Sequence, residues 1–229
     1  MKKQILYYTD NRCNTDIWLA VQNKLKSFNI PIVSVSLSPI DFGENIVFNG
    51  KRGRLTMFKQ ILMGLEKCTA DVIFMAEHDV LYHKSHFDFV PKSKEVFYYN
   101  ENRWRVDFET VKALFYLCGS TSGLCAYRDL LIKHYRKRVE QVEKHGYDHK
   151  LGYEPGITSH NIDDSTYELW KSEYPNIDIR HKDCLTESRW TRDKFRDKTT
   201  CLGWKEADDV PGWGITKNRM KVFIGENNG

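Results

Sequence analysis

The chain has 229 residues, of which 41% are hydrophobic, 29% charged and 13% aromatic. This length and apolar share suffice for one large α/β domain with a single core, and the aromatic content excludes a disordered chain. Lys and Arg number 35 against 31 Asp and Glu, giving a formal net charge of +4. That excess is too small to identify a nucleic-acid-binding protein or to exclude one.

The sequence lacks the marks of a secreted or membrane-inserted protein. No apolar run is long enough to cross a bilayer, and no long apolar stretch with a cleavage site follows the two N-terminal lysines. The six cysteines are scattered, with no pair at Cys-x-x-Cys spacing. We therefore expect a cytoplasmic protein with reduced thiols, without membrane insertion, a disulfide framework or a cysteine-based zinc site.

The first half of the chain alternates strands and helices. The predicted order is a strand at 4–9, a helix that begins at Asn14 or Thr15 and ends near 27, a strand at 32–37, a helix at 54–67 and an apolar strand at 70–76. Apolar residues at helical spacing support the second helix, and the absence of polar alternation in 70–76 is typical of a central strand covered on both faces. This order predicts an α/β fold with a largely parallel sheet.

The second half of the chain is less regular. It predicts strands at 96–99, 111–117 and 177–179, a long basic helix at 129–144 and a further helix at 165–172. The segment 183–214 is polar and contains tryptophan without clear periodicity, so we expect it to wrap the domain. The whole of 1–229 is predicted to form a single domain.

Acidic residues follow two of the predicted strands. Asp10 comes after the first strand, and Glu77 and Asp79 come directly after the apolar strand. Ligands of open parallel sheets bind at the carboxyl ends of strands, and side chains two residues apart on an extended chain point the same way. Glu77 and Asp79 are therefore predicted to hold a divalent cation through oxygen ligands. The alternative is that the pair only ends the strand and begins a turn.

The segment from Gly50 through the helix at 54–67 to Asp79 resembles the GT-A glycosyltransferases. The resemblance implies a Rossmann-like, mostly parallel central sheet flanked by helices, with an irregular C-terminal segment. It also implies a donor and metal half at 1–100 and an acceptor half with the C-terminal wrap at 101–229. In that family an Asp-x-Asp type motif binds Mn²⁺ or Mg²⁺ and the diphosphate of a nucleotide-sugar. Here Glu77 stands in the place of the first acid, which departs from the motif.

The resemblance implies roles for particular residues. The metal ligands would be Asp79, Glu77 and His181. The residues at the nucleotide-sugar would be Thr9, Asp10, Arg12, Arg52, Arg54, Glu77 and His78, with Lys51 as a further cation. The catalytic base of an inverting enzyme would be Asp164, Asp163 or Glu154, in that order. The small-residue loop 118–123 would approach donor and acceptor. The competing interpretations are a structural His181, a helix cap at 163–164, an ordinary turn at 118–123 and a solvated basic loop at 51–54.

The predicted activity is therefore metal-dependent transfer of a sugar from a nucleotide-sugar, with UDP as the favoured nucleotide, to a hydroxyl acceptor. Aromatic and basic residues interleave at 103–105 and 189–192, and a basic helix face is expected at 134–138. This pattern suits a hydroxylated pyrimidine in DNA, as in phage-type enzymes, or a cell-surface polysaccharide as acceptor. Two other classes stay open. A nucleotidyltransferase is disfavoured because the loop after the first strand has no glycine, and a non-catalytic carbohydrate- or nucleic-acid-binding module is the second.

Overall fold

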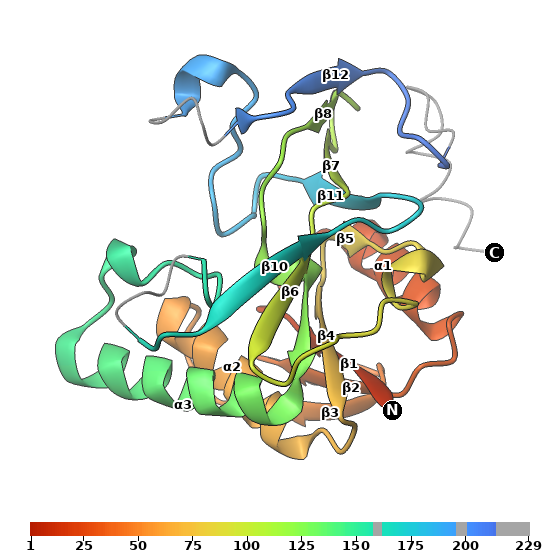
Figure 1. Ribbon diagram of the computed structural model, residues 1–229. Helices are drawn as coiled ribbons and strands as arrows, with labels where there is room; N and C mark the ends of the chain where they lie inside the picture. The colour runs from red at the N-terminus through yellow and green to blue at the C-terminus, as the bar shows by residue number, and fades with distance from the viewer. Residues whose placement is uncertain (158–161, 196–200, 214–229) are drawn as a thin grey trace.

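The computed structural model describes residues 1–157, 162–195 and 201–213, which form two sheets, the smaller standing above the larger in Figure 1. The larger sheet has the strand order β10-β6-β9-β4-β1-β2-β3, and the smaller has the order β12-β8-β7-β11-β5. The strands of the larger sheet are β1 (Lys3–Tyr8), β2 (Ile32–Ser36), β3 (Glu44–Val47), β4 (Val72–Glu77), β6 (Val96–Asn100), β9 (Leu124–Tyr127) and β10 (Thr166–Trp170). Those of the smaller sheet are β5 (Val80–Leu81), β7 (Arg103–Asp107), β8 (Ala113–Phe115), β11 (Asn176–Arg180) and β12 (Lys205–Ala207).

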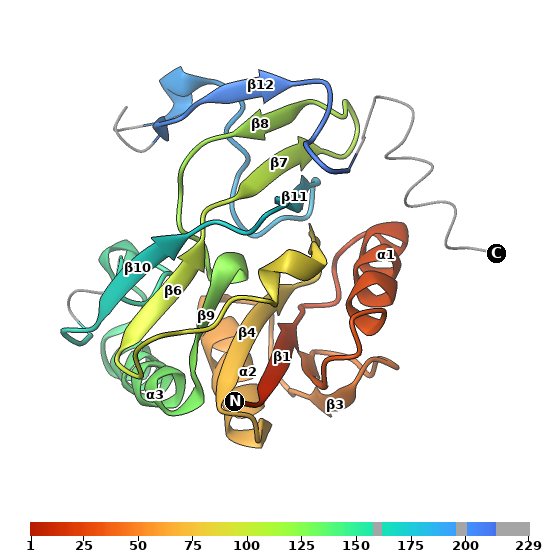
Figure 2. The same ribbon diagram turned by 45° about the vertical axis from the view of Figure 1, so that its right-hand side comes forward.

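Among the described residues, three α-helices flank the larger sheet. They are α1 (Thr15–Lys26), α2 (Arg54–Lys67) and α3 (Arg128–His145). Helix α1 packs on one face, and α2 and α3 pack together on the other, as the two views in Figures 1 and 2 show. Strands β1, β2, β3 and β4 pair in parallel, as do β6 and β10, while β9 runs antiparallel to β4 and β6. The predicted α/β fold with a mostly parallel central sheet flanked by helices is confirmed.

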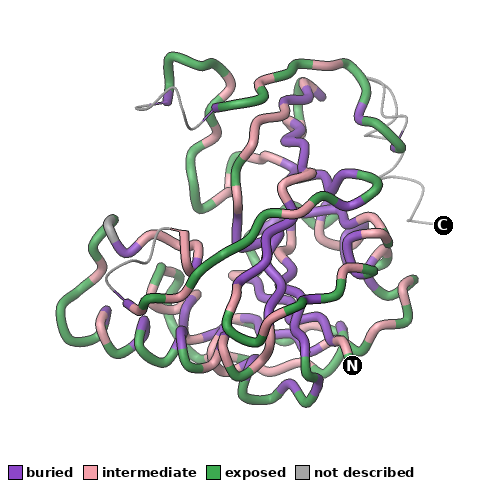
Figure 3. The backbone as a smooth tube through the Cα atoms, viewed as in Figure 1, coloured by how far each residue is buried: buried purple, intermediate pink, exposed green. Residues whose placement is uncertain are grey.

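Strand β1 shows why the central strands lack polar alternation. Ile5 and Tyr7 point into the core under α1, and Leu6 and Tyr8 point into the core under α2 and α3. A strand covered on both faces needs apolar side chains at every position. In Figure 3 the buried backbone accordingly runs through the middle of the larger sheet, and the exposed backbone follows the helices and loops around it.

The predicted helix at 165–172 is wrong. Residues 166–170 form β10, which pairs in parallel with β6 along its whole length. Four of its five residues are exposed, because β10 is the edge of the larger sheet. The sequence carried a strand signal that the helix prediction overlooked, because Thr166, Tyr167, Glu168 and Leu169 alternate polar and apolar and aromatic residues favour strands.

The smaller sheet was not predicted as a sheet, although two of its strands were. Only 113–115 of the predicted strand 111–117 is strand β8, and Val111 has a positive φ of 59° in the turn that joins β7 to β8. The described part of the C-terminal segment adds β12 antiparallel to β8, and the expectation that this segment wraps the domain stays a prediction. The last predicted residue of that segment, 214, lies outside the described residues. Whether 1–229 is one domain stays a prediction.

In the part of the chain that the structure describes, no helix is both long enough and apolar enough to span a membrane.

Helix α2 approaches the sheet closely at Gly64. This residue is buried, and a Cβ atom built there would overlap the side chains of Leu6 on β1 and Val35 on β2. Gly64→Ala should destabilise the fold, because overpacking a core costs about 1–3 kcal/mol, which exceeds the gain of up to about 1 kcal/mol in helix propensity. Urea unfolding measures the change, with the exposed Lys67→Ala on the same helix as control. A Gly64→Ala variant as stable as the wild type would contradict this account of the packing.

Candidate active site

A cavity of about 570 Å³ lies at the carboxyl ends of β1 and β4. Helix α1 leads from β1 to β2 over one face of the sheet, and α2 leads back to β4 over the other face, so the direction of winding reverses between β1 and β4. Ligands of open α/β sheets bind at such a reversal. The smaller sheet forms the opposite wall of the cavity through residues 103, 105, 178 and 180. The volume lies in the range of small-molecule sites.

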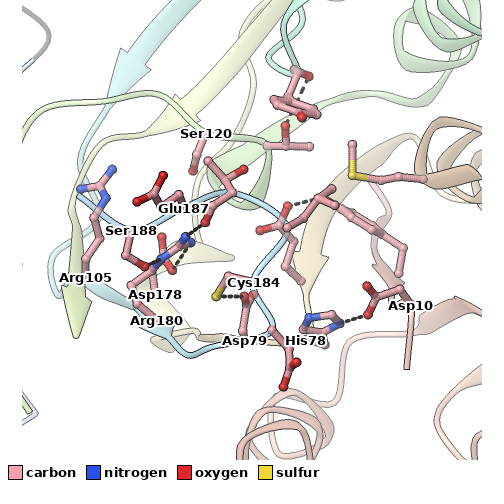
Figure 4. Close-up of a pocket in the computed structure, with 18 of the residues that line it drawn as sticks. Asp10, His78, Asp79, Arg105, Ser120, Asp178, Arg180, Cys184, Glu187 and Ser188 are labelled. Atoms are coloured by element: carbon pink, nitrogen blue, oxygen red, sulfur yellow. Dashed lines mark hydrogen bonds and ion pairs between the residues drawn. The ribbon is translucent and has the colours of Figure 1, made fainter. Parts of the chain in front are cut away.

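Asp79 is the centre of a possible cation site. It follows β4, and the loop after β11 brings His181 and Cys184 to it, so that one ligand atom of each residue lies within 4.8 Å of the others. The Asp79 Oδ2 atom is 3.6 Å from His181 Nε2 and 3.7 Å from Cys184 Sγ. Figure 4 shows Cys184 turned toward Asp79. The structure thus brings together two of the three predicted metal ligands, Asp79 and His181.

Glu77, the third predicted metal ligand, lies outside this group. Tyr8 donates a hydrogen bond of 2.5 Å to its Oε1 atom. Strand β4 ends at Glu77, and residues 78 and 79 form a turn, so the strand alternation that would point Glu77 and Asp79 the same way does not continue to Asp79. The argument from strand alternation therefore does not apply to Asp79, although both residues line the cavity.

The two carboxyl groups also differ in charge. Burial and the neighbouring Asp79 raise the pKa of Glu77. Burial acts in the same direction on Asp79, but His181, His78 and Arg180 outweigh it and hold the pKa of Asp79 well below its usual range. One ionised carboxylate beside a neutral one is the arrangement that two close acids adopt when only one has cationic neighbours.

The group around Asp79 fits a divalent cation by its donor chemistry. It combines a carboxylate oxygen, an imidazole nitrogen and a sulfur atom, all of which serve as metal ligands. The His181 Nε2 atom is buried and has no hydrogen-bond partner among the residues that the structure describes. On the other side of the ring, the Asp183 backbone N–H donates to Nδ1 at 3.3 Å. If a metal ion bound at Nε2, the ring proton would be on Nδ1, which could then no longer accept the hydrogen bond from the Asp183 backbone.

Thr9, Asp10, Arg52 and His78 meet at one end of the cavity. The Thr9 hydroxyl lies 2.7 Å from His78 Nδ1, and Arg52 Nε donates to Asp10 Oδ2 at 2.5 Å. Arg52 also donates to the carbonyl of Asp183 at 2.9 Å, which ties the loop after β11 to the loop before α2. Of the residues predicted at the nucleotide-sugar, these four and Glu77 therefore line one cavity.

Arg12 and Arg54 do not line the cavity. The Arg54 side chain donates to the Tyr153 hydroxyl, and its guanidinium lies 4.4 Å from the centre of the Tyr147 ring. The side chain of Arg12 is exposed. Lys51 is exposed as well and lies outside the lining, so Arg52 is the one basic residue of the segment 51–54 that reaches the cavity.

The three candidate bases are separated in space. Glu154 lines the cavity, whereas Asp163 and Asp164 do not. Asp163 accepts a hydrogen bond of 2.7 Å from the ring of His134 on α3 and another from the Ser165 backbone N–H at 3.1 Å. Asp164 is exposed. The geometry therefore favours Glu154, the third-ranked of the candidate bases in the sequence analysis.

The wall formed by the smaller sheet carries three arginines and one carboxylate. Asp178 pairs with Arg103 at 3.1 Å and with Arg180 at 3.4 Å. Arg105 has no carboxylate of the described residues within ion-pair distance. Its guanidinium lies 3.5 Å from the centre of the Tyr116 ring, and it donates to the Tyr116 carbonyl at 3.4 Å. In Figure 4 this wall lies across Asp79 from Asp10 and His78.

Arg105 remains a cation although it is only 7% exposed. Burial, together with the repulsion of Arg103, lowers its pKa to about 10, which still leaves the guanidinium charged at neutral pH. A buried charge without a counter-ion costs free energy. The wall of the smaller sheet is therefore suited to an anionic ligand.

The predicted acceptor clusters are placed differently. Arg189 and Trp190 line the cavity, and so does the loop at 118–121. Trp104, by contrast, is 7% exposed and packs in the core, because it alternates on β7 with the two arginines that face the cavity. The basic helix face predicted at 134–138 is reduced to Arg136 and Lys137, since the other three residues of that segment are buried.

Sequence reasoning missed Cys184, and it grouped Arg105 with Arg103 and Trp104 although only the two arginines line the cavity. Two patterns carried the information. Residues 103–106 alternate basic and apolar, which is typical of a strand with one polar face. His181 and Cys184 are three residues apart, a spacing that allows one tight turn to present two metal ligands.

Comparison with known proteins gives no family assignment. No protein-family profile and no curated protein matches the chain. Among solved structures it is similar to a glycosyltransferase involved in the glycosylation of the major capsid of PBCV-1, at 9% identity over 75% of this chain and 82% of that one, with a TM-score of 0.45. A Drosophila β-galactosyltransferase 7 mutant in complex with manganese, UDP-Gal and xylobiose has 13% identity over 86% and 81% of the two chains, with a TM-score of 0.43.

A third solved structure, the glycosyltransferase GlyE of Streptococcus pneumoniae, has 11% identity over 74% of this chain and 46% of its own length, with a TM-score of 0.42. These neighbours are all glycosyltransferases. Because their TM-scores lie below 0.5, the likeness supports no inference about the chemistry of this site.

The contact between Asp163 and His134 has a consequence for stability. Burial opposes ionisation of Asp163, but the hydrogen bonds from His134 and Ser165 hold its pKa well below the usual range. Asp163→Asn should lower the free energy of unfolding at neutral pH by about 1 kcal/mol, the difference between a charge-assisted and a neutral hydrogen bond. A group with a lowered folded pKa stabilises above its unfolded pKa, so the difference should shrink as the pH falls below about 4.

Urea unfolding of Asp163→Asn and wild type at a series of pH values measures this effect. The exposed neighbour provides the control, because Asp164→Asn should leave the free energy of unfolding unchanged. An equal loss in both variants, or a difference that grows in acid, would contradict the assigned contact.

Proposed function

We propose that this protein is a cytoplasmic, metal-dependent GT-A glycosyltransferase that moves a sugar from a nucleotide-sugar, UDP-sugar being favoured, to a hydroxyl acceptor. The observation that carries the proposal is the ionised Asp79 grouped with His181 and Cys184 at the reversal point of the sheet, in a cavity with an arginine-rich wall. A nucleotide-sugar releases a diphosphate, and such a leaving group requires positive charge near its phosphate oxygens.

Each part of the cavity has a task in this proposal. Bound Mn²⁺ or Mg²⁺, held by Asp79 and His181, would supply electrostatic stabilisation of the diphosphate. Arg52 adds a cation on the same side, and its hydrogen bonds to Asp10 and to the Asp183 carbonyl fix its position. Thr9 and Asp10, at the carboxyl end of β1, would bind the nucleoside.

Glu154 is the proposed base if the reaction inverts the anomeric centre. It is the one member of the three candidate bases that lines the cavity, and a base must reach the acceptor hydroxyl. Asp163 is engaged by His134 outside the cavity, which favours a structural role for it. In a retaining reaction none of the three is needed as a base.

A thermal-shift screen of UDP-, GDP-, CDP- and dTDP-sugars, with and without Mn²⁺, tests the proposal. A ligand that binds only the folded state raises the melting temperature. At a concentration of one hundred times its Kd, it adds about 2.7 kcal/mol to the free energy of unfolding. We expect a shift that needs both Mn²⁺ and one nucleotide-sugar. Asp79→Asn should abolish the Mn²⁺-dependent part, because an amide is a weaker ligand than a carboxylate.

Glu154→Gln is the matched control for Asp79→Asn. It also replaces a carboxylate of the cavity lining by an amide, and it should keep the metal-dependent shift while losing turnover. The screen separates the alternatives as well. A binding module should keep its affinity in Asp79→Asn, and a nucleotidyltransferase should respond to a nucleoside triphosphate and a sugar phosphate. The absence of any metal-dependent shift would overturn the proposal.

For the acceptor, we propose a hydroxylated pyrimidine in DNA, with a cell-surface polysaccharide as the alternative. Two features of the cavity support DNA. Arg105 is a buried cation without a carboxylate partner among the described residues, so it suits a phosphodiester. Trp190 and Phe195 line the same cavity, and aromatic side chains stack on an extruded base.

Arg105→Gln tests the acceptor. Binding of plain and hydroxymethylated duplex DNA, measured over a series of salt concentrations, should be weaker in this variant, with a salt slope reduced by about one unit because one phosphate contact is lost. Arg136→Gln is the control, since Arg136 pairs with Glu66 on α2 outside the cavity. Equal weakening in both variants would indicate non-specific attraction, and no binding of either DNA would favour a glycan acceptor.

A further inference from the structure

A short turn after β11 presents a sulfur atom to the proposed metal site. The Cys184 backbone N–H donates to the His181 carbonyl at 3.2 Å, and the His181 backbone N–H faces Cys184 Sγ at 3.3 Å. These contacts close the turn and direct both side chains toward Asp79. The sulfur also lies 4.0 Å from the Ile179 carbonyl. Cys184 is thus held in place by the same turn that holds His181.

Two groups of side chains compete as the ligand set, and they share His181. One is Asp79, His181 and Cys184, and the other is Cys13, His78 and His181. The first contains a carboxylate, whereas the second contains none. In the second group, His78 Nδ1 is already in contact with the Thr9 hydroxyl at 2.7 Å. A divalent cation is therefore better compensated in the first group.

We propose that Cys184 is a ligand of the metal ion, together with Asp79 and His181. This inference rests on the metal dependence of the proposed function and extends it to the choice of metal. Thiolate binds borderline cations such as Zn²⁺ and Co²⁺ far better than the hard Mg²⁺, and nitrogen ligation acts in the same direction. The site accordingly selects Co²⁺ or Zn²⁺ over Mg²⁺.

Cobalt absorption spectroscopy of the whole, metal-free chain tests this ligand directly. Co²⁺ alone is titrated into the protein, and the near-ultraviolet band of thiolate-to-cobalt charge transfer is recorded. The wild type should show the band, and Cys184→Ser should lose it. Cys13→Ser, which removes the sulfur of the competing group, and Cys118→Ser, which removes an exposed thiol, should keep it.

A competition experiment on the wild type supports the same inference without a variant. A large excess of Mg²⁺ should leave the cobalt band unchanged, and Zn²⁺ should remove it. Displacement by Mg²⁺ would overturn the proposed selectivity. The melting temperature of each variant, measured without metal, establishes that the loss of the band does not come from unfolding.

The outcomes distinguish the ligand from the function. If Cys13→Ser loses the band and Cys184→Ser keeps it, the metal belongs to the other group and the proposal fails. If Co²⁺ binds without a sulfur band, Cys184 is not a ligand, while metal-dependent transfer through Asp79 and His181 stands. If neither Co²⁺ nor Mn²⁺ binds the wild type, both the ligand assignment and the metal dependence of the proposed function fail.

Discussion

The turn at residues 78–79 is the point on which the two sheets and the candidate site depend. It ends β4 of the larger sheet and begins β5 of the smaller one. The carbonyl of Asp79 accepts a hydrogen bond of 2.8 Å from the Ile179 backbone N–H, and β5 pairs with β11 beside it. The same residue that joins the sheets by its backbone thus supplies the central carboxylate by its side chain. Any shift of one sheet against the other would move Asp79 relative to His181.

The cavity separates its charges between the two sheets. The larger sheet contributes Glu77, and the turn after it contributes the ionised Asp79. The smaller sheet contributes three arginines, of which Arg103 and Arg180 pair with Asp178 and Arg105 pairs with no carboxylate of the described residues. Removing one partner from such a buried network leaves an uncompensated charge. This explains how a chain with a net charge of only +4 can present a strongly polarised cavity.

The donor side could be read from the sequence because its signals are local. The segment 72–76 is apolar throughout, and the acids directly after it mark the carboxyl edge of the sheet. The argument from strand alternation failed for Glu77 because the chain turns immediately after it. The position of the smaller sheet could not be predicted, for a different reason. Arg105 and Cys184 are brought to one cavity by the pairing of β7 with β11, which joins segments about 70 residues apart in sequence. The local patterns at 103–106 and 181–184 do not show which residues these segments will face.

The close packing at Gly64 also affects the cavity. It presses α2 against β1 and β2, and the first turns of the same helix, from Gly53 to Gln60, line the cavity. Gln60 Nε2 also donates to the Thr9 carbonyl at 2.9 Å, at the end of β1. The amino end of a helix carries about half a positive elementary charge from its unpaired N–H groups. The absence of a side chain at Gly64 therefore sets the distance between the positively charged amino end of α2 and an anionic ligand in the cavity.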